Sequence, residues 1–304
     1  MLPRTYLRGG VLEKIIGTYA VDNQTIEYSI IGKEGVPVLV MHGGHSSCYE
    51  EFGYCSLIEN GFKIITPSRA GYGKTSKEIG ESLSKACDYY VGLLNHLGIE
   101  KIHLIAVSAG GPSGLYFASH YPEKVKTLTL QSAVTKEWHT PKDKIYKIAQ
   151  ILFRPSMERI TWKLISSMSN LFPEFMFKQM TPSFSKLPYK QIKEKMADED
   201  VDEIRRMNNR QRSGYGFLID LSQTKEITIK DLEAISCPTL IQHSKHDEAV
   251  PLEHAYYAHQ QISDSRLCLL DTWGHLIWLG QGSKEVNKKL IEFLLYYSKP
   301  FKNT

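Results

Sequence analysis

One serine at the end of an apolar run is the first residue whose surroundings suggest chemistry. Residues 104–111 read LIAVSAGG, so Ser108 follows an apolar run and is followed at once by alanine and two glycines. A chain that passes from a strand directly into a helix holds its apex residue in a strained conformation, and only small neighbours fit beside it. Ser108 would then be exposed at a helix N-terminus, where backbone amides and positive potential face whatever the hydroxyl attacks. A serine in this position can also act as a simple helix N-cap.

Other polar residues stand at the ends of similar apolar runs. They are HGGH at 42–45, SRAGYG at 68–73, HSKHD at 243–247 and GH at 274–275. Open parallel sheets bind ligands beyond the carboxyl ends of their strands, so these ends carry the candidate site residues.

The elements that must position these residues alternate along the chain. Short β-branched runs predict strands, and longer segments with helical apolar spacing predict helices at 81–98 and 110–125. The strands are expected within 36–44, 62–73, 101–108, 125–134, 237–247 and 265–275, with an antiparallel hairpin at 18–32 and a closing helix from Lys284. Nearly continuous apolar strands suit a sheet covered on both faces, so the fold class is α/β, with a doubly wound, mostly parallel sheet.

The alternation stops between residues 134 and 230. This stretch has helical spacing, many aromatic residues and expected breaks at Pro155, Pro173, Pro182 and Pro188, so it predicts an all-helical insertion. The sheet domain would then be discontinuous, formed by 1–133 and 231–304.

The serine segment resembles a known family. AVSAGG at 106–111 resembles the nucleophile elbow G-x-S-x-G of the α/β-hydrolase fold superfamily, with Ala106 in place of the first glycine. A serine nucleophile needs a base, and the base needs a carboxylate that fixes its tautomer. The family orders them as serine, acid and histidine, and Asp247 and His275 match that order at the ends of two later strands. The resemblance implies a catalytic triad of Ser108, Asp247 and His275, although Asp247 alone could be a turn or helix-cap aspartate and His275 alone an incidental loop histidine.

The resemblance extends to the loops around the serine. HGG at 42–44 resembles the family's oxyanion loop, so the backbone amides of Gly44 and Ala109 would bind the developing negative charge. His42 is expected to brace this loop, and SRAGYGKTS at 68–76 is interpreted as a structural turn. The insertion resembles a cap over the substrate, and the candidate pocket residues are Gly43, His45, Trp138 and Trp162. Cap aromatics indicate an apolar cavity or cap core, namely Trp138, Phe153, Trp162, Phe172, Phe175, Phe177, Phe184 and Phe217.

The function that this pattern favours is a serine hydrolase. It would cleave a small to medium, partly apolar ester, amide or related acyl compound through an acyl-enzyme, with no cofactor. One alternative is a non-catalytic member of the fold that binds a ligand. Another is a metal-dependent hydrolase, because H-x-x-H occurs at 42–45 and 243–246 beside Asp247, although neither pair lies on a predicted helix.

Composition excludes several other classes. The 37 basic and 33 acidic residues are scattered, which argues against nucleic-acid binding. No apolar stretch is long enough for a membrane helix and no signal peptide begins the chain, so we expect a cytoplasmic protein. The five cysteines form no C-x-x-C pair, so we expect reduced thiols. The expected partner is a small-molecule substrate. The sequence sets no oligomeric state.

Overall fold

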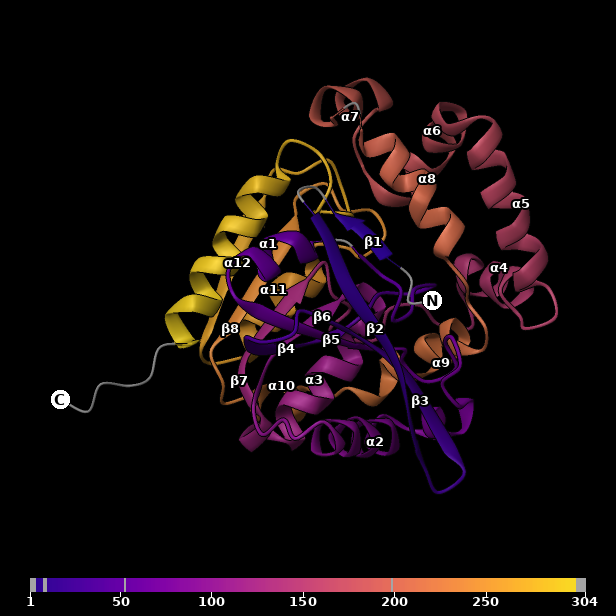
Figure 1. Ribbon diagram of the computed structural model, residues 1–304. Helices are drawn as coiled ribbons and strands as arrows, with labels where there is room; N and C mark the ends of the chain where they lie inside the picture. The colour runs from indigo at the N-terminus through magenta and orange to yellow at the C-terminus, as the bar shows by residue number, and fades with distance from the viewer. Residues whose placement is uncertain (1–3, 8–9, 52, 198, 299–304) are drawn as a thin grey trace.

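A nine-stranded sheet forms the centre of the molecule in the residues that the computed structural model describes, which are 4–7, 10–51, 53–197 and 199–298. The order of the strands is β1-β2-β3-β5-β4-β6-β7-β8-β9 (Figure 1). Their bounds are Arg4–Leu7, Gly10–Val21, Gln24–Ile31, Val36–Met41, Phe62–Pro67, Ile102–Val107, Val125–Gln131, Thr239–Ser244 and Ser265–Leu270 for β1 to β9. From β5 to β9 the strands run parallel, whereas β1, β2 and β3 add antiparallel pairs at one edge. The predicted fold class is confirmed.

The edge hairpin follows from its turn. Asp22 and Asn23 link β2 to β3 and have φ angles of 50° and 60°, which fits a two-residue turn whose twist matches that of the strands. The hairpin predicted at 18–32 is therefore correct, and β2 extends it toward the N-terminus.

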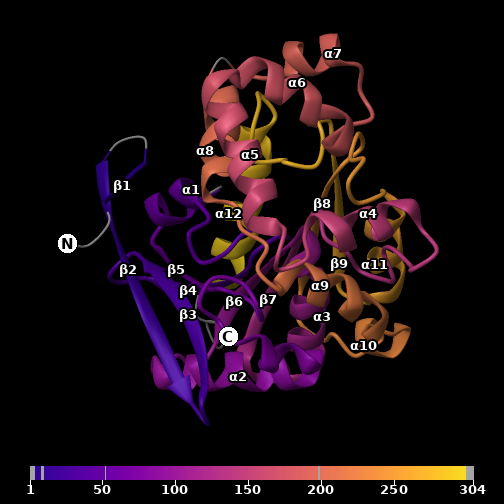
Figure 2. The same cartoon turned by 90° about the vertical axis from the view of Figure 1, so that its right-hand side faces the viewer.

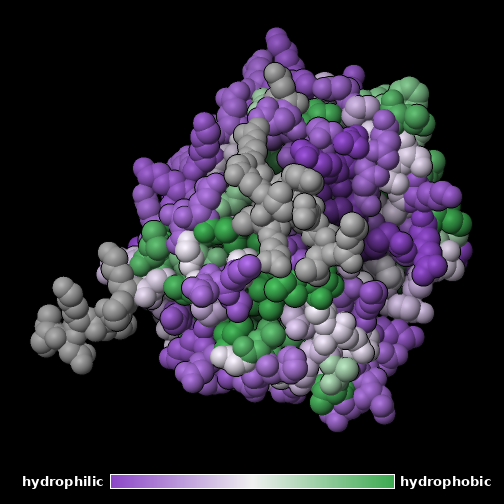
Figure 3. All heavy atoms as spheres, viewed as in Figure 1, coloured by the Kyte–Doolittle hydropathy of each residue, from purple (hydrophilic) through white to green (hydrophobic). Residues whose placement is uncertain are grey.

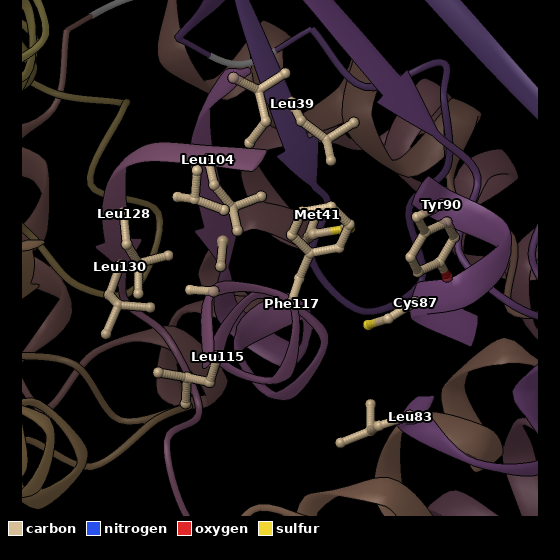
Figure 4. Packing of buried hydrophobic residues seen from close by; sticks show 14 of the residues in the cluster. Leu39, Met41, Leu83, Cys87, Tyr90, Leu104, Leu115, Phe117, Leu128 and Leu130 are labelled. Atoms are coloured by element: carbon tan, nitrogen blue, oxygen red, sulfur yellow. The ribbon is translucent and has the colours of Figure 1, made fainter. Parts of the chain in front are cut away.

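Helices cover both faces of the sheet. One face packs against α1 (Tyr54–Glu59) and α12 (Ser283–Ser298), and the other against α2 (Leu83–His96), α3 (Gly111–His120) and α11 (Glu253–Gln261). Alternate residues of each strand enter the two layers, because side chains of a strand point to opposite faces. Leu39 and Met41 of β4 face α2 and α3 (Figure 4), while Val38 and Val40 face α1 and α12. Among the described residues no helix is both long enough and apolar enough to cross a bilayer.

Six α-helices occur in the described part of the predicted insertion, and most of them form the upper part of the molecule in Figures 1 and 2. They are α4 (Lys144–Leu152), α5 (Glu158–Leu171), α6 (Pro173–Phe184), α7 (Tyr189–Lys195), α8 (Asp200–Arg210) and α9 (Gly216–Gln223). The surface is apolar where α5 meets α6, at the upper right of Figure 3, because Leu171, Phe172 and Phe175 are exposed. We call residues 134–228 the cap.

Two details differ from the expectations. The boundary expected at 230 falls inside α10 (Ile229–Glu233), which contacts α3 and α11 and so packs with the sheet layers. The break expected at Pro182 is absent, since Pro182 lies inside the last turn of α6. Proline has no N–H for the carbonyl of Lys178, and the Thr181 hydroxyl donates to that carbonyl instead, at 2.9 Å.

Candidate active site

Ser108 stands at the junction of β6 and α3, where the chain turns through one short 3-10 segment (Ser108–Gly110). Its φ of 50° is uncommon for a residue with a side chain, so the junction holds it in a strained conformation. The glycines are needed because a Cβ on Gly111 would lie 2.0 Å from the carbonyl oxygen of Val134. The methyl group of Ala106 fits because it faces Gly114, where a Cβ would approach it to 2.4 Å.

The structure brings Ser108, His275 and Asp247 into one hydrogen-bonded chain. The Oγ atom of Ser108 lies 2.9 Å from Nε2 of His275, and Nδ1 of His275 lies 2.8 Å from Oδ2 of Asp247. Asp247 is fully buried, which by itself would raise the pKa of its carboxyl group. The electrostatic interaction with His275 and the hydrogen bonds from His243 and His275 outweigh burial and hold the pKa of Asp247 below its ordinary value. The carboxylate is therefore ionised at neutral pH and fixes Nδ1 of His275 as a donor.

A second histidine touches the same carboxylate. Nε2 of His243 lies 3.3 Å from Oδ2 of Asp247 and 2.9 Å from the carbonyl oxygen of Val250. Both neighbours are acceptors, so Nε2 of His243 carries the hydrogen. The amide of Val250 also donates to Oδ1 of Asp247, at 2.9 Å. His243 entered the sequence analysis only as a possible metal ligand, and nothing local to β8 predicts this supporting contact.

The chain between α6 and α7 contacts both loops that carry the acid and the histidine. The carbonyl of Phe184 accepts from the amide of His275 at 2.8 Å, and the amide of Lys186 donates to the carbonyl of His246 at 2.9 Å. Ser185 pairs with Asp247 in an isolated β-bridge. Trp273 and Leu276, on either side of His275, are buried in the apolar cluster of α6, α7 and α8. The cap linker 184–186 thus forms part of the scaffold of the site.

The loop at 42–44 lies directly beside the serine. A Cβ on Gly43 would lie 3.3 Å from Cβ of Ser108, and one on Gly44 would lie 3.5 Å from the methyl of Ala109. His42 accepts from the amide of Arg69 at Nε2 and donates from Nδ1 to the carbonyl of Gly43, so it braces the loop as expected. Two causes hold the pKa of His42 well below 6.5: burial is the larger, and the positive charge of Arg69 is the smaller. The ring is therefore neutral. That the amides of Gly44 and Ala109 bind an oxyanion stays a prediction.

The turn after β5 is joined to the cap by a buried ion pair. The guanidinium of Arg69 donates two hydrogen bonds to the carboxylate of Asp220 on α9, and the hydroxyl of Tyr72 donates a third at 2.6 Å. Burial alone would lower the pKa of Arg69, but the adjacent carboxylate of Asp220 raises it above its usual value. The sequence analysis interpreted the turn as structural and missed this partner.

A cavity of about 410 Å³ opens over the serine. All four predicted pocket residues, Gly43, His45, Trp138 and Trp162, line it together with Phe153, Phe184 and Phe217. Of the other cap aromatics, Phe177 is cap core, and Phe172 and Phe175 are exposed.

The polar atoms of the roof are paired with one another. Nε1 of Trp162 donates to Oγ of Ser213 at 2.7 Å, and the same Oγ is hydrogen-bonded to Nδ1 of His45 at 2.8 Å. Burial lowers the pKa of His45 to about 3, so this ring is neutral at neutral pH.

The histidines and acid considered as metal ligands are dispersed. His42 braces its loop, His45 contacts Ser213, His246 pairs with Asp271, and His243 supports Asp247. In the part of the chain that the structure describes, no group of three or more His, Cys, Asp and Glu residues is arranged to hold a metal ion.

Comparison with known proteins assigns the family. The model of the α/β hydrolase fold matches residues 36–280, which include Ser108, Asp247 and His275. The chain belongs to the α/β-hydrolase fold family. Family members serve many functions on this scaffold, so the substrate has to be argued from the site.

Individual α/β-hydrolase relatives cover almost the whole chain. "Uncharacterized hydrolase YcgS" of Bacillus subtilis is 60% identical over 93% of this chain and 99% of its own length. The 2-hydroxy-6-oxo-6-phenylhexa-2,4-dienoate hydrolase of Comamonas testosteroni is 24% identical over 88% of this chain and 91% of its own. Among solved structures, an α/β hydrolase fold protein from Nakamurella multipartita has a TM-score of 0.79 at 24% identity and covers 94% of this chain and 100% of its own. That likeness concerns the fold alone.

Proposed function

We propose that this α/β-hydrolase is a serine hydrolase that cleaves a neutral, partly apolar ester or amide through an acyl-enzyme. One observation carries the proposal. The strained Ser108 is hydrogen-bonded to His275, which is hydrogen-bonded to the buried Asp247, and both Ser108 and His275 line an apolar cavity. A positioned base of this kind contributes about 10²–10⁴-fold in rate.

The first half of the reaction acylates the serine. Nε2 of His275 accepts the proton of Ser108 Oγ while Oγ forms a bond to the carbonyl carbon of the substrate. The carbonyl oxygen becomes an oxyanion, which the amides of Gly44 and Ala109 bind. Each such donor is worth roughly 3 kcal/mol of transition-state stabilisation. The tetrahedral intermediate then loses its alcohol or amine, which takes the proton from His275, and the acyl group stays on Ser108.

The second half releases the acyl group by the same route. His275 removes a proton from water, and the resulting oxygen nucleophile attacks the acyl carbon. Collapse of this intermediate frees a carboxylic acid and returns the proton to Ser108. Asp247 keeps its charge in both halves and stabilises the imidazolium form of His275.

The lining of the cavity supports a neutral substrate. Neither lysine nor arginine occurs among the described residues that line it, and Glu50, an acidic lining residue, pairs with Arg210. A substrate carboxylate would therefore lose its hydration without gaining a cation, which is costly. The Comamonas relative is named for a dienoate, a carboxylate. We infer that the substrate of this chain lacks such a group.

Labelling with a fluorophosphonate probe tests the proposal. Intact mass spectrometry and peptide mapping should find one adduct, on Ser108, and none in Ser108→Ala. Ser113→Ala is the matched control, because Ser113 is a buried serine on α3, the helix that follows the elbow. It should label like the wild type.

Turnover completes the test. The wild type should hydrolyse p-nitrophenyl esters, and both Ser108→Ala and His275→Ala should lose this activity while keeping the wild-type circular dichroism. Undiminished hydrolysis by Ser108→Ala overturns the proposal. So does a folded wild type that takes no label and cleaves no ester, and this outcome favours the ligand-binding alternative.

A further inference from the structure

The residues that line the cavity include several from the apolar layer between the sheet and the helices α1 and α12, so the cavity extends below Ser108 into this layer. We call this part the core arm and define it by Val40, Tyr54, Leu57, Ile105, Trp278 and Leu290, which line the cavity and belong to or pack against the apolar cluster of this layer. The cap residues around His45 lie at the other end of the same cavity. The core arm is therefore a separate binding region that the cap does not form.

The depth of the core arm follows from the strand that forms its wall. Ile105 and Val107 are alternate residues of β6 and point to the same face as Val40 of β4. Ile105 precedes Ser108 by three residues, and each residue of a strand advances the chain by about 3.3 Å, so the cavity reaches roughly 10 Å below the serine.

Five of the side chains that form the core arm are almost fully buried. Val40, Leu57 and Ile105 expose 2%, 2% and 3% of their surfaces, and Tyr54 and Leu290 expose 4% and 3%. A group in the arm is therefore surrounded by these buried side chains, and the arm begins at Ser108.

The polar side chains of this region are already paired with protein groups. Nε1 of Trp278 donates to Oε1 of Gln131 at 3.0 Å, and Nε2 of Gln131 donates to Gln242 at 2.9 Å. The hydroxyl of Tyr54 lies 3.1 Å from that of Thr66. A ligand in the core arm is met by hydrocarbon surfaces, which favours an alkyl chain over a polar group.

The chemistry of the proposed function decides which part of a substrate occupies the arm. The alcohol or amine leaves after the first half of the reaction, whereas the acyl group stays bonded to Ser108 until water arrives. An arm that begins at the serine and has buried walls fits the acyl group, which stays bonded to Ser108, better than the leaving group, which must depart. We propose that the core arm binds the alkyl chain of the acyl group, so the substrates carry unbranched acyl chains of medium length. This inference rests on the proposed function.

Two substitutions with opposite effects on the arm test the inference. Leu290→Phe narrows it, and Leu57→Ala widens it. The control for the first is Leu294→Phe, the same change one turn later on α12, because Leu294 is buried in the same layer but does not line the cavity. The kcat/KM values are measured for p-nitrophenyl acetate, butyrate, hexanoate and octanoate.

The wild type should prefer hexanoate or octanoate to acetate. Leu290→Phe should lower the octanoate-to-acetate ratio of kcat/KM about tenfold or more, since a pocket discriminates by that much for even one misfitting methylene. Leu57→Ala should shift the preference to longer chains, and Leu294→Phe should keep the wild-type ratio. Octyl acetate, with its chain on the alcohol, should be affected equally by Leu290→Phe and Leu294→Phe.

The outcomes separate the two proposals. If the wild type cleaves these esters but Leu290→Phe and Leu57→Ala leave the chain-length profile unchanged, the core arm is not the acyl site and the hydrolase proposal stands. If Leu290→Phe lowers kcat/KM for octyl acetate and not for p-nitrophenyl octanoate, the arm binds the leaving group. This result also overturns the inference. A wild type that cleaves no ester and takes no fluorophosphonate overturns the proposed function itself. Leu57→Ala keeps the test decisive if Leu290→Phe fails to fold.

Discussion

Breaking the ion pair between Arg69 and Asp220 should lower the free energy of unfolding more than the removal of any surface charge in this protein. The two side chains expose 2% and 3% of their surfaces and join the turn after β5 to α9. Removal of either partner leaves the other charge buried without compensation, which costs about 3–5 kcal/mol. Arg69→Met and Asp220→Leu should each lower the free energy of unfolding by this amount. The double variant contains neither charge, so its loss should be no larger than that of one single variant.

Urea unfolding followed by circular dichroism measures these free energies. The coupling energy is the difference between the loss in the double variant and the summed losses of the single variants, and we expect it to be several kcal/mol. Lys85→Met and Glu81→Leu form a control cycle, because that pair lies on the surface and should couple by less than about 1 kcal/mol. Additive losses at Arg69 and Asp220 would refute the reasoning, since they would mean that neither charge depends on the other.

Three further predictions concern the site, the elbow and the pH dependence. Asp247→Asn should lower kcat by about 10⁴-fold with little change in KM in steady-state assays of p-nitrophenyl butyrate, whereas the exposed Asp271→Asn should keep wild-type rates. Gly111→Ala should lower the free energy of unfolding in urea by about 1–3 kcal/mol, because its Cβ would overlap the carbonyl of Val134; a wild-type value would contradict the packing. Burial lowers the pKa of His103 to about 4, so below its unfolded value of 6.5 the unfolded chain binds a proton that the folded chain does not, and stability falls as pH falls. Between about pH 6 and pH 4.5, His103→Gln should reduce that slope by about 1.4 kcal/mol per pH unit, and an unchanged slope would show that His103 titrates alike in both states.

Much of the fold and the positions of the candidate catalytic residues could be predicted because they follow from local patterns. The apolar strands indicate a covered parallel sheet, and all parallel strands direct their carboxyl ends to one edge. Residues at the ends of β6, β8 and β9 therefore meet although they are far apart in the chain. Ser108 could be singled out because the tight junction between strand and helix at this residue leaves room only for small neighbours, and these are visible in the sequence.

Contacts between the cap and the sheet could not be predicted in this way. Arg69 and Asp220 are separated by 151 positions, and no periodic pattern relates them. A signal does exist, because Asp220 interrupts the apolar run GFLIDLSQ and a carboxylate within such a run needs a partner. The sequence does not say which partner. The support of Asp247 by His243 and the depth of the core arm likewise depend on three-dimensional packing.

The cap linker 184–186 limits how substrates can enter. Its backbone is hydrogen-bonded to the loops of Asp247 and His275, so a swing of this side of the cap would separate acid from base. Gly274 makes the attachment tight, because a Cβ there would lie 2.4 Å from the carbonyl oxygen of Phe184. We therefore expect substrates to enter beside α4 and α5, because Phe153, which follows α4, and Trp162 and Ile165 of α5 line the cavity. For protein engineering, α4 and α5 are the replaceable part of the roof, whereas a graft that removes the linker also dismantles the site beneath it.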